Sequence, residues 1–270
     1  MLYDAHCHLD FPVFDIDREE VLQRAKLAGV NTIILAATTA ATWPRLLNLV
    51  ESSSLPSLLP SFLPSPQLYA CLGLHPLFID KHQPEDLTQL KEQLLTSPKV
   101  IALGEIGIDL HSPKLKAQEA KQWRFFDAQL TLAKELDLPV VIHVRQAMDL
   151  VIQRLRRFQL PQGGLLHAFS GSQQQAEQLV ELGFKIGLGG GITYPRANKL
   201  RQIAQKLPLT AFLLETDSPD MPLNGLQGQR NEPAKVALVA ETLAELRKTS
   251  LEKLLPVLYS SLLKTFSRLG

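Results

Sequence analysis

The segment Leu2-Tyr3-Asp4-Ala5-His6-Cys7-His8-Leu9 is the starting point from which the fold is predicted. It predicts a strand, which ends before Phe11-Pro12 opens a loop. Because successive side chains of a strand point to opposite faces, His6 and His8 share one face and Cys7 lies on the other. Two imidazoles at a strand end form half of a metal site, which needs anionic partners from elsewhere in the chain. Alone, the pattern also fits two ordinary polar residues.

Seven more short apolar runs follow, separated by amphipathic segments. We predict strands at residues 2–9, 30–37, 68–74, 100–104, 139–143, 164–167, 184–189 and 211–215. Strands that are apolar at nearly every position are buried on both faces, which is typical of a parallel sheet. Eight such strands alternating with helices predict a closed α/β barrel, the TIM or (β/α)8 fold. The sequence shows no repeat and no domain boundary, so residues 1–270 are expected to form a single domain.

The intervening segments predict helices. Asp17 and Glu20 have the form of a capping box at the start of the first helix, and Gly29 is placed to end it. The clearest helical pattern covers residues 117–137, where apolar side chains recur every three or four positions. Residues 52–66, rich in Ser, Pro and Leu, are expected to form a surface connection, with a lid or a docking peptide as the alternative.

Composition limits the classes of function. The chain has 28 Lys and Arg against 27 Asp and Glu, so no global positive field attracts a long nucleic-acid duplex. There is no apolar run long enough to cross a membrane and no signal peptide. Cys7 and Cys71 are the only cysteines, which is too few for a disulfide framework. A reducing cytoplasm is therefore the expected location.

Metal-binding residue types occur where the predicted strands end, which is where barrel enzymes hold their active sites. Strand ends one, four, five, six and eight supply His6, His8, Glu105, His143, His167 and Asp217. Four histidines and two carboxylates exceed the three protein ligands typical of one catalytic zinc, and they suit two ions. A bridging anion relieves the repulsion between two close cations, and Glu105 has the central position for that role. Asp217 is predicted to hold one ion and to act as the general base toward a bridging hydroxide.

Six strings occur in an order that resembles the TatD family of metal-dependent hydrolases. They are D-A-H-C-H-L-D, G-L-H-P, G-E-I-G-I-D, H-V-R, H-A-F-S-G and E-T-D-S-P, and residues 190–196 and 220–225 resemble the YjjV-like branch more closely. The resemblance covers nearly the whole chain. It implies a TIM barrel of the metallo-dependent hydrolase superfamily, two divalent metals and phosphodiester hydrolysis, with DNase activity in some members. It also implies that His6, His8 and Asp217 hold one ion, His143 and His167 the other, and Glu105 both.

The sequence departs from the family pattern at three places. Gln146 stands where the family often has an acidic residue, and Asp220 stands where many members have an aromatic one. Ser260 and Ser261 occupy the region of a C-terminal Asn. None of these positions is a predicted ligand, so the departures concern the substrate rather than the metals.

Several side chains are candidates for contacting the substrate. Arg145 follows His143 by two residues and is expected to point into the mouth, where it would clamp a phosphate oxygen; a salt bridge to a neighbouring loop is the alternative. Arg196 and Arg230 lie on the predicted loops after strands seven and eight, where barrels often bind phosphate, although surface arginines are common. His75 ends the third strand and would touch substrate or make a structural hydrogen bond.

Other polar residues have simpler expected roles. Glu215 shares a strand face with Asp217 and is expected to orient a ligand, and Asp4 stands in the same relation to His6. His82 and His111 are expected to be exposed loop residues, and Cys7 a core thiol. Three aromatic residues are candidates for stacking a base, although packing is the simpler role: Phe11, Phe169 and Tyr194.

The sequence therefore predicts a hydrolase that acts on phosphoester bonds, with a nucleic-acid end or a small phosphoester as substrate. Zinc fits the histidines, whereas magnesium or manganese would fit a nuclease. A binuclear amidohydrolase or lactonase is the first alternative, but such enzymes often bridge their metals with a modified lysine on strand four, and residues 100–105 contain none. A non-catalytic metal-binding or docking protein is the second. No membrane partner and no obligate protein partner is indicated.

Overall fold

The computed structural model describes residues 1–52 and 65–269, and within them eight strands form one parallel sheet. Each strand pairs with the next one along the chain, from β1 to β8. The strands are β1 Leu2–Cys7, β2 Val30–Ala36, β3 Gln67–Leu72, β4 Val100–Asp109, β5 Val140–Arg145, β6 Gly164–Leu166, β7 Phe184–Leu188 and β8 Phe212–Leu214. All eight predicted strands are present, and β4 extends five residues beyond its predicted end.

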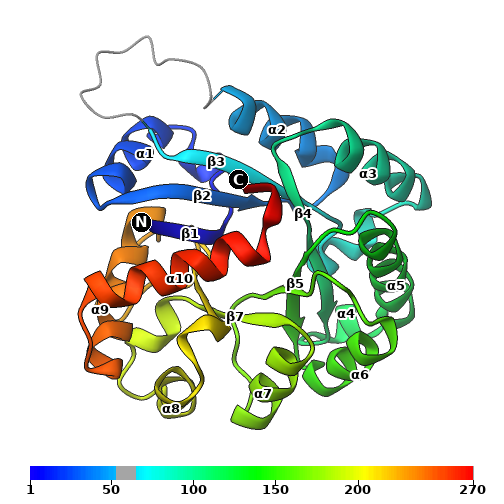
Figure 1. Ribbon diagram of the computed structural model, residues 1–270. Coiled ribbons are helices and arrows are strands. Elements are labelled where there is room, and N and C mark those ends of the chain that lie inside the picture. The colour runs from blue at the N-terminus through cyan, green and yellow to red at the C-terminus, as the bar shows by residue number, and fades with distance from the viewer. Residues whose placement is uncertain (53–64, 270) are drawn as a thin grey trace.

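Helices surround the strands, as Figure 1 shows. They are α1 Arg18–Leu27, α2 Trp43–Ser52, α3 Pro84–Thr96, α4 Pro113–Lys116, α5 Glu119–Glu135, α6 Met148–Phe158, α7 Gln173–Glu181, α8 Asn198–Lys206, α9 Val236–Arg247 and α10 Leu251–Thr265. None of these helices combines the length and the apolar character that crossing a membrane requires, within the part of the chain that the structure describes. The arrangement confirms the predicted (β/α)8 barrel.

The first and last strands meet where the barrel closes. The backbone amide of Asp217 donates to the carbonyl oxygen of His6 at 2.9 Å, and that of His8 donates to Ser218 at 2.7 Å. The carboxylate of Asp4 accepts from both the backbone amide and the hydroxyl of Thr216, at 2.9 and 2.6 Å. The closure therefore places the ends of β1 and β8 side by side.

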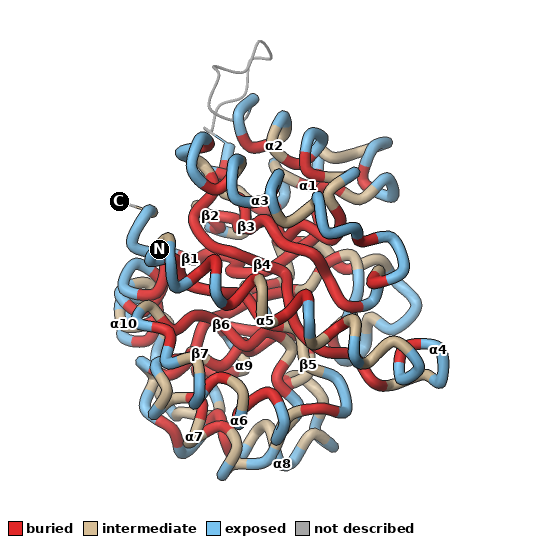
Figure 2. The backbone as a smooth tube through the Cα atoms, turned by 90° about the vertical axis from the view of Figure 1, so that its right-hand side faces the viewer, coloured by how far each residue is buried: buried red, intermediate tan, exposed pale blue. Residues whose placement is uncertain are grey.

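The strands form the core. All ten residues of β4 are buried, and Figure 2 shows buried backbone through the strands and exposed backbone on the outer helices. Complete burial of a Val, Leu or Ile side chain stabilises a fold by about 1.5–3 kcal/mol relative to exposure. Since apolar residues fill both faces of the strands, the polar residues at the strand ends are held on a rigid frame.

Two local predictions have different outcomes. Gly29 has a φ of +85° directly after α1, a conformation that glycine adopts without steric cost, so its role in ending the helix is confirmed. The capping box is wrong: Asp17 does occupy the N-cap position, but its side chain makes no capping hydrogen bond and pairs with Arg230 instead. The alternatives for residues 52–66 fall largely on residues 53–64, outside the described part of the chain.

Candidate metal centre

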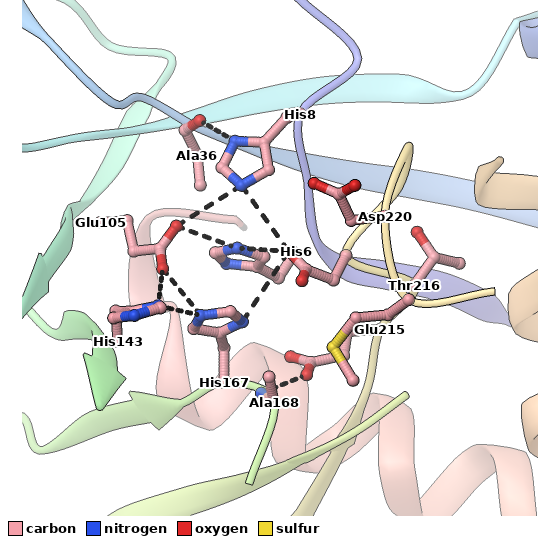
Figure 3. Close-up of polar contacts among 12 residues, drawn as sticks. His6, His8, Ala36, Glu105, His143, His167, Ala168, Glu215, Thr216 and Asp220 are labelled. Atoms are coloured by element: carbon pink, nitrogen blue, oxygen red, sulfur yellow. Dashed lines mark hydrogen bonds and ion pairs between the residues drawn. The ribbon is translucent and has the colours of Figure 1, made fainter. Parts of the chain in front are cut away.

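All six predicted ligands converge at the C-terminal end of the barrel, and Figure 3 shows His6, His8, Glu105, His143 and His167 turned toward one another. Glu105 lies in the middle and is only 1% exposed. His6 lies in β1 and His8 one residue after it, and their rings meet edge to face with centroids 5.1 Å apart. His143 lies in β5, and His167 and Asp217 lie just after β6 and β8. The alternation of side chains along the first strand therefore places its two histidines together.

One oxygen of Glu105 faces the first histidine pair. Its Oε2 atom lies 3.2 Å from His6 Nε2 and 3.5 Å from His8 Nε2. The Oδ1 atom of Asp217 lies 3.4 and 3.6 Å from the same two nitrogens. Two nitrogens and two carboxylate oxygens thus surround one small volume.

The other oxygen of Glu105 faces the second pair. Its Oε1 atom lies 3.1 Å from His143 Nδ1 and 2.7 Å from His167 Nε2. These two nitrogens are 3.2 Å apart, so the three atoms form a compact triangle. Glu105 therefore presents one oxygen to each pair, which is the geometry expected of a bridging ligand.

The donor set fits divalent cations. Ligand atoms about 2.1 Å from a tetrahedral ion lie about 3.4 Å from one another, and about 3.0 Å apart around an octahedral one. The spacings are 3.2–3.6 Å in the first group and 2.7–3.2 Å in the second, close to these values. Although His6 Nε2 is close to Glu105 Oε2, the two do not meet in hydrogen-bond geometry, and neither atom has a hydrogen-bond partner among the described residues. Buried polar atoms left unpaired in this way are suited to a shared cation.

The electrostatics of the cation-free centre point the same way. Burial alone would lower the pKa of His6 and His143, but the neighbouring carboxylates outweigh it, raising that of His6 well above its ordinary value and that of His143 to about 9. Burial alone would raise the pKa of Glu105, but its interactions with the surrounding imidazoles, first those of His167, His75 and His6, hold it well below its ordinary value. The carboxylates therefore demand positive charge, which protons supply until cations replace them.

The outer nitrogens of two rings are fixed by acceptors. His8 Nδ1 donates to the carbonyl oxygen of Ala36 at 2.8 Å, which leaves the lone pair of Nε2 facing the centre. His143 Nε2 lies 3.1 Å from Oδ2 of Asp109, so once the ring is neutral its proton stays on Nε2 and the Nδ1 lone pair faces Glu105. Burial alone would raise the pKa of Asp109, but hydrogen bonds from His143 and His111 hold it well below its ordinary value. Both rings thus have the tautomer that a cation requires.

Backbone constraints seat the ligands. At Gly73 a Cβ atom would lie 2.7 Å from the backbone carbonyl carbon of Gly104 and 2.8 Å from the backbone carbonyl oxygen of Glu105. Only glycine therefore allows the end of β3 to approach β4 this closely. Three non-glycine residues have positive φ at strand ends beside the site: Asp217 at 57°, Ala168 at 46° and Gln146 at 58°. Such conformations are unfavourable and cluster at functional sites.

The two predicted orienting carboxylates act on backbone rather than on rings. Glu215 accepts from the amide of Ala168, next to His167, at 2.6 Å, and burial raises its pKa to about 8. Asp4 accepts from the backbone amides of His6 and Thr216, at 3.3 and 2.9 Å. They hold strand ends in place, and the ligand whose segment Glu215 supports is His167.

His75 makes structural contacts with both ring nitrogens. Its Nδ1 accepts from the amide of Leu77 at 3.0 Å, so the proton of the neutral ring is on Nε2, which donates to Glu105 Oε1 at 2.9 Å. Burial lowers its pKa to about 4, so the ring is neutral at pH 7. The structural alternative considered from the sequence therefore describes His75 better than a substrate contact.

The three candidate arginines differ. Arg145 is exposed and makes no side-chain hydrogen bond or ion pair with any residue the structure describes. Arg196 is also exposed and lies 5.4 Å from the ring centroid of Tyr194. Arg230 is committed elsewhere: it makes two hydrogen bonds to Asp17, at 2.9 and 2.6 Å, and lies over the ring of Phe14. This pairing disfavours a substrate contact for Arg230.

The sequence interpretation missed Asp109 and misplaced two histidines. Asp109 is four residues after Glu105 in one strand, so the strand period already places both carboxylates on one face. His82, predicted to be exposed, is buried and hydrogen-bonded through Nε2 to the carbonyl oxygen of His75. His111, predicted to be exposed as well, is partly buried because its Nδ1 bonds Asp109 at 2.8 Å.

Comparisons with known proteins agree with the motifs. Residues 3–267 match the family model described as TatD related DNase. The chain is 48% identical over 265 residues to a protein of Escherichia coli (strain K12) named uncharacterized metal-dependent hydrolase YjjV, covering 98% of this chain and 97% of YjjV. The crystal structure of the Escherichia coli K12 TatD homologue YjjV matches with a TM-score of 0.89 and 47% identity over 98% of both chains. Human deoxyribonuclease TATDN3 is 33% identical over 281 residues, covering 99% of this chain and 95% of TATDN3. The chain therefore belongs to the TatD family.

Proposed function

We propose that this protein is a hydrolase that uses two divalent cations to cleave phosphoester bonds, acting as a DNase or exonuclease-type phosphodiesterase. The observation that carries the proposal is that the two carboxylate oxygens of Glu105 face separate histidine pairs. The names of its relatives support it, since YjjV is called a metal-dependent hydrolase and TATDN3 a deoxyribonuclease. His6, His8 and Asp217 would hold one cation, His143 and His167 the other, and Glu105 both.

When bound, the two cations would supply a water of lowered pKa as the nucleophile and would neutralise charge on the phosphoryl oxygens. The protein's own contribution is to hold the donor atoms apart at the spacing described above. Glu105 is enclosed by five imidazoles and is sealed from solvent, so it is suited to bridging rather than to proton transfer.

Asp217 is the general base in this proposal. Its side chain is 14% exposed, whereas that of Glu105 is 1% exposed, so it is the carboxylate open to the mouth. Burial alone would raise its pKa, but the close contact with His6, together with the imidazoles of His167 and His8, holds it below its ordinary value. It is therefore a carboxylate at pH 7 and accepts the proton of the attacking water while the ester oxygen leaves toward solvent.

The substrate is held at the rim. Arg145, exposed and two residues past His143, is placed to bind a phosphate oxygen, and Arg196 lies on the loop after β7. A cavity of about 350 Å³ lies between the start of α6 and the loop after β6, and Gln146, Asp149, Ser170 and Gln175 are among the residues that line it. The net charge of +1 offers little attraction to a long duplex, so we propose a strand end or a small phosphoester as substrate.

Two further points follow from the side chains. Four imidazoles favour zinc, although magnesium or manganese is compatible with the same spacing. Cys7 and Cys71 are both buried and unpaired, which favours a reducing compartment such as the cytoplasm.

The test is turnover by metal-depleted protein resupplied with Mg²⁺, Mn²⁺ or Zn²⁺. We expect hydrolysis of bis-p-nitrophenyl phosphate, little turnover of an amide and lactone panel, and loss of activity in Glu105→Gln. Single-stranded DNA and RNA labelled at the 3′ or 5′ end should then give a ladder from one end. Faster turnover of lactones or amides than of phosphodiesters would overturn the proposal in favour of the binuclear amidohydrolase or lactonase alternative.

A further inference from the structure

The four imidazoles of the centre are not supported equally. His8 is held by the backbone carbonyl of Ala36, and the Nδ1 atoms of His6 and His167 have no hydrogen-bond partner among the residues that the structure describes. Among the four, only the outer nitrogen of His143 lies within hydrogen-bond distance of a charged side chain, Asp109, whereas Nδ1 of His167 is 4.0 Å from the nearest carboxylate oxygen, that of Asp217. The hydrogen-bonded carboxylate behind a ring is therefore found only in the second histidine pair, at His143.

Asp109 is itself held at three points. Its Oδ1 atom accepts from the backbone amide of His111 at 2.9 Å and from the ring Nδ1 of the same residue at 2.8 Å. Its backbone is fixed separately by Gln122 of α5, which accepts from the Asp109 amide at 2.8 Å and donates to its carbonyl oxygen at 3.0 Å. Gln122 therefore places the strand end, while His111 sets the direction of the carboxylate.

The chain of contacts runs from the surface to the centre. The side chain of His111 is 31% exposed, that of Asp109 is 2% exposed, and Oδ2 of Asp109 reaches His143 at 3.1 Å. A carboxylate accepts only, so the ring proton of neutral His143 stays on Nε2 and the lone pair of Nδ1 stays directed at Glu105 and His167. Rotation of the Asp109 carboxylate would free the His143 ring to turn and its proton to move from Nε2 to Nδ1.

We propose that Asp109 and His111 are positioning residues for the cation at His143 and His167, and that their loss weakens this cation without weakening the one at His6 and His8. The inference rests on the two cations of the proposed function but not on the reaction that they serve.

Three variants test the inference. If the side-chain NH2 of Asp109→Asn faces His143, it donates to Nε2, which moves the ring proton to Nδ1 and removes the ligand atom. If the side-chain oxygen faces His143 instead, it is a weaker acceptor than a carboxylate and holds the ring less firmly. His111→Phe keeps the bulk and the backbone donor but removes the ring donor. His111→Asn restores a donor close to the position of Nδ1. Ser112→Ala is the matched control, since it perturbs the same loop at a residue whose hydroxyl caps α4.

The measurement is titration of the metal-depleted full chain with Zn²⁺ alone, by competition with a chromophoric chelator, together with the bound zinc per chain. Loss of an outer-sphere partner typically weakens metal binding about 10- to 100-fold. We expect the wild type to bind two equivalents of zinc. In Asp109→Asn the affinity for one equivalent alone should fall by that factor, and in His111→Phe it should fall by less. His111→Asn and Ser112→Ala should bind zinc like the wild type. Nitrogen-15 shifts of His143 should report the altered tautomer in Asp109→Asn.

Equal weakening of both equivalents, or a His111→Phe protein that binds zinc like the wild type, would overturn the inference. A wild type that binds a single equivalent would also overturn it. A protein that binds two equivalents with the expected selectivity yet hydrolyses no phosphoester would contradict the proposed function and leave the inference standing.

Discussion

The Nε2 atom of His75 donates to Oε1 of Glu105 at 2.9 Å, while its Nδ1 atom accepts from the amide of Leu77. Both ring nitrogens are thus occupied by the protein, so His75 supports the Glu105 oxygen that also faces His143 and His167. We expect His75→Phe to weaken metal binding about 10- to 100-fold, because Glu105 loses its orienting donor. With metal at saturation, KM for the phosphodiester should be unchanged. A raised KM under those conditions would show that His75 contacts substrate after all.

Asp217 offers a second test. Its carboxylate lies within 3.6 Å of the Nε2 atoms of both His6 and His8, and it is the more exposed of the two central carboxylates. Asp217→Asn keeps the shape and one oxygen but cannot accept a proton, so kcat should fall by about 10²- to 10⁴-fold. Zinc content of the variant, measured beside activity, separates loss of the base from loss of the ion. Unchanged turnover would show that Asp217 is not the base.

The fold and the convergence of the six side chains were predictable because both depend on short-range periodicity. His6 and His8 alternate along one strand, and polar residues at strand ends meet at one face of a barrel. Asp109 was within reach of the same argument, since it shares a strand face with Glu105. Although His111 follows Asp109 by two residues, no pattern in the sequence indicated that Asp109 also reaches His143 of the next strand.

Contacts between distant segments were not predictable. Asp17 has the local pattern of a helix cap, but its carboxylate pairs with Arg230, 213 residues away. One contact therefore accounts for two misjudged residues. His82 and His111 carry no pattern around them, and only the packed structure shows that each bonds another residue of the centre.

Arg145 and Arg230 should respond differently to truncation. Arg145→Ala removes an exposed guanidinium that has no partner among the described residues, and a lost charge-assisted hydrogen bond to phosphate should raise KM about 10- to 100-fold. Arg145→Lys keeps the charge but not the two-pronged geometry, so its KM should lie between those of the wild type and Arg145→Ala. Arg230→Ala breaks the pairing with Asp17 and should lower the melting temperature with KM unchanged. A raised KM in Arg230→Ala alone would restore Arg230 as the substrate contact.

Binding of cations should release protons. In the cation-free protein the carboxylates raise the pKa of His143 to about 9 and that of His6 well above its ordinary value, so both rings are protonated at pH 7. Glu105 and Asp217 have lowered pKa values and carry no proton to release. A cation requires the neutral ring, so each pair should release one proton, and affinity should rise about tenfold per pH unit per proton as pH increases toward 9. Calorimetric titration with Zn²⁺ in buffers of different ionisation enthalpy measures the number of protons released. Binding without proton release at pH 7 would show that the carboxylates do not hold these rings in the charged form.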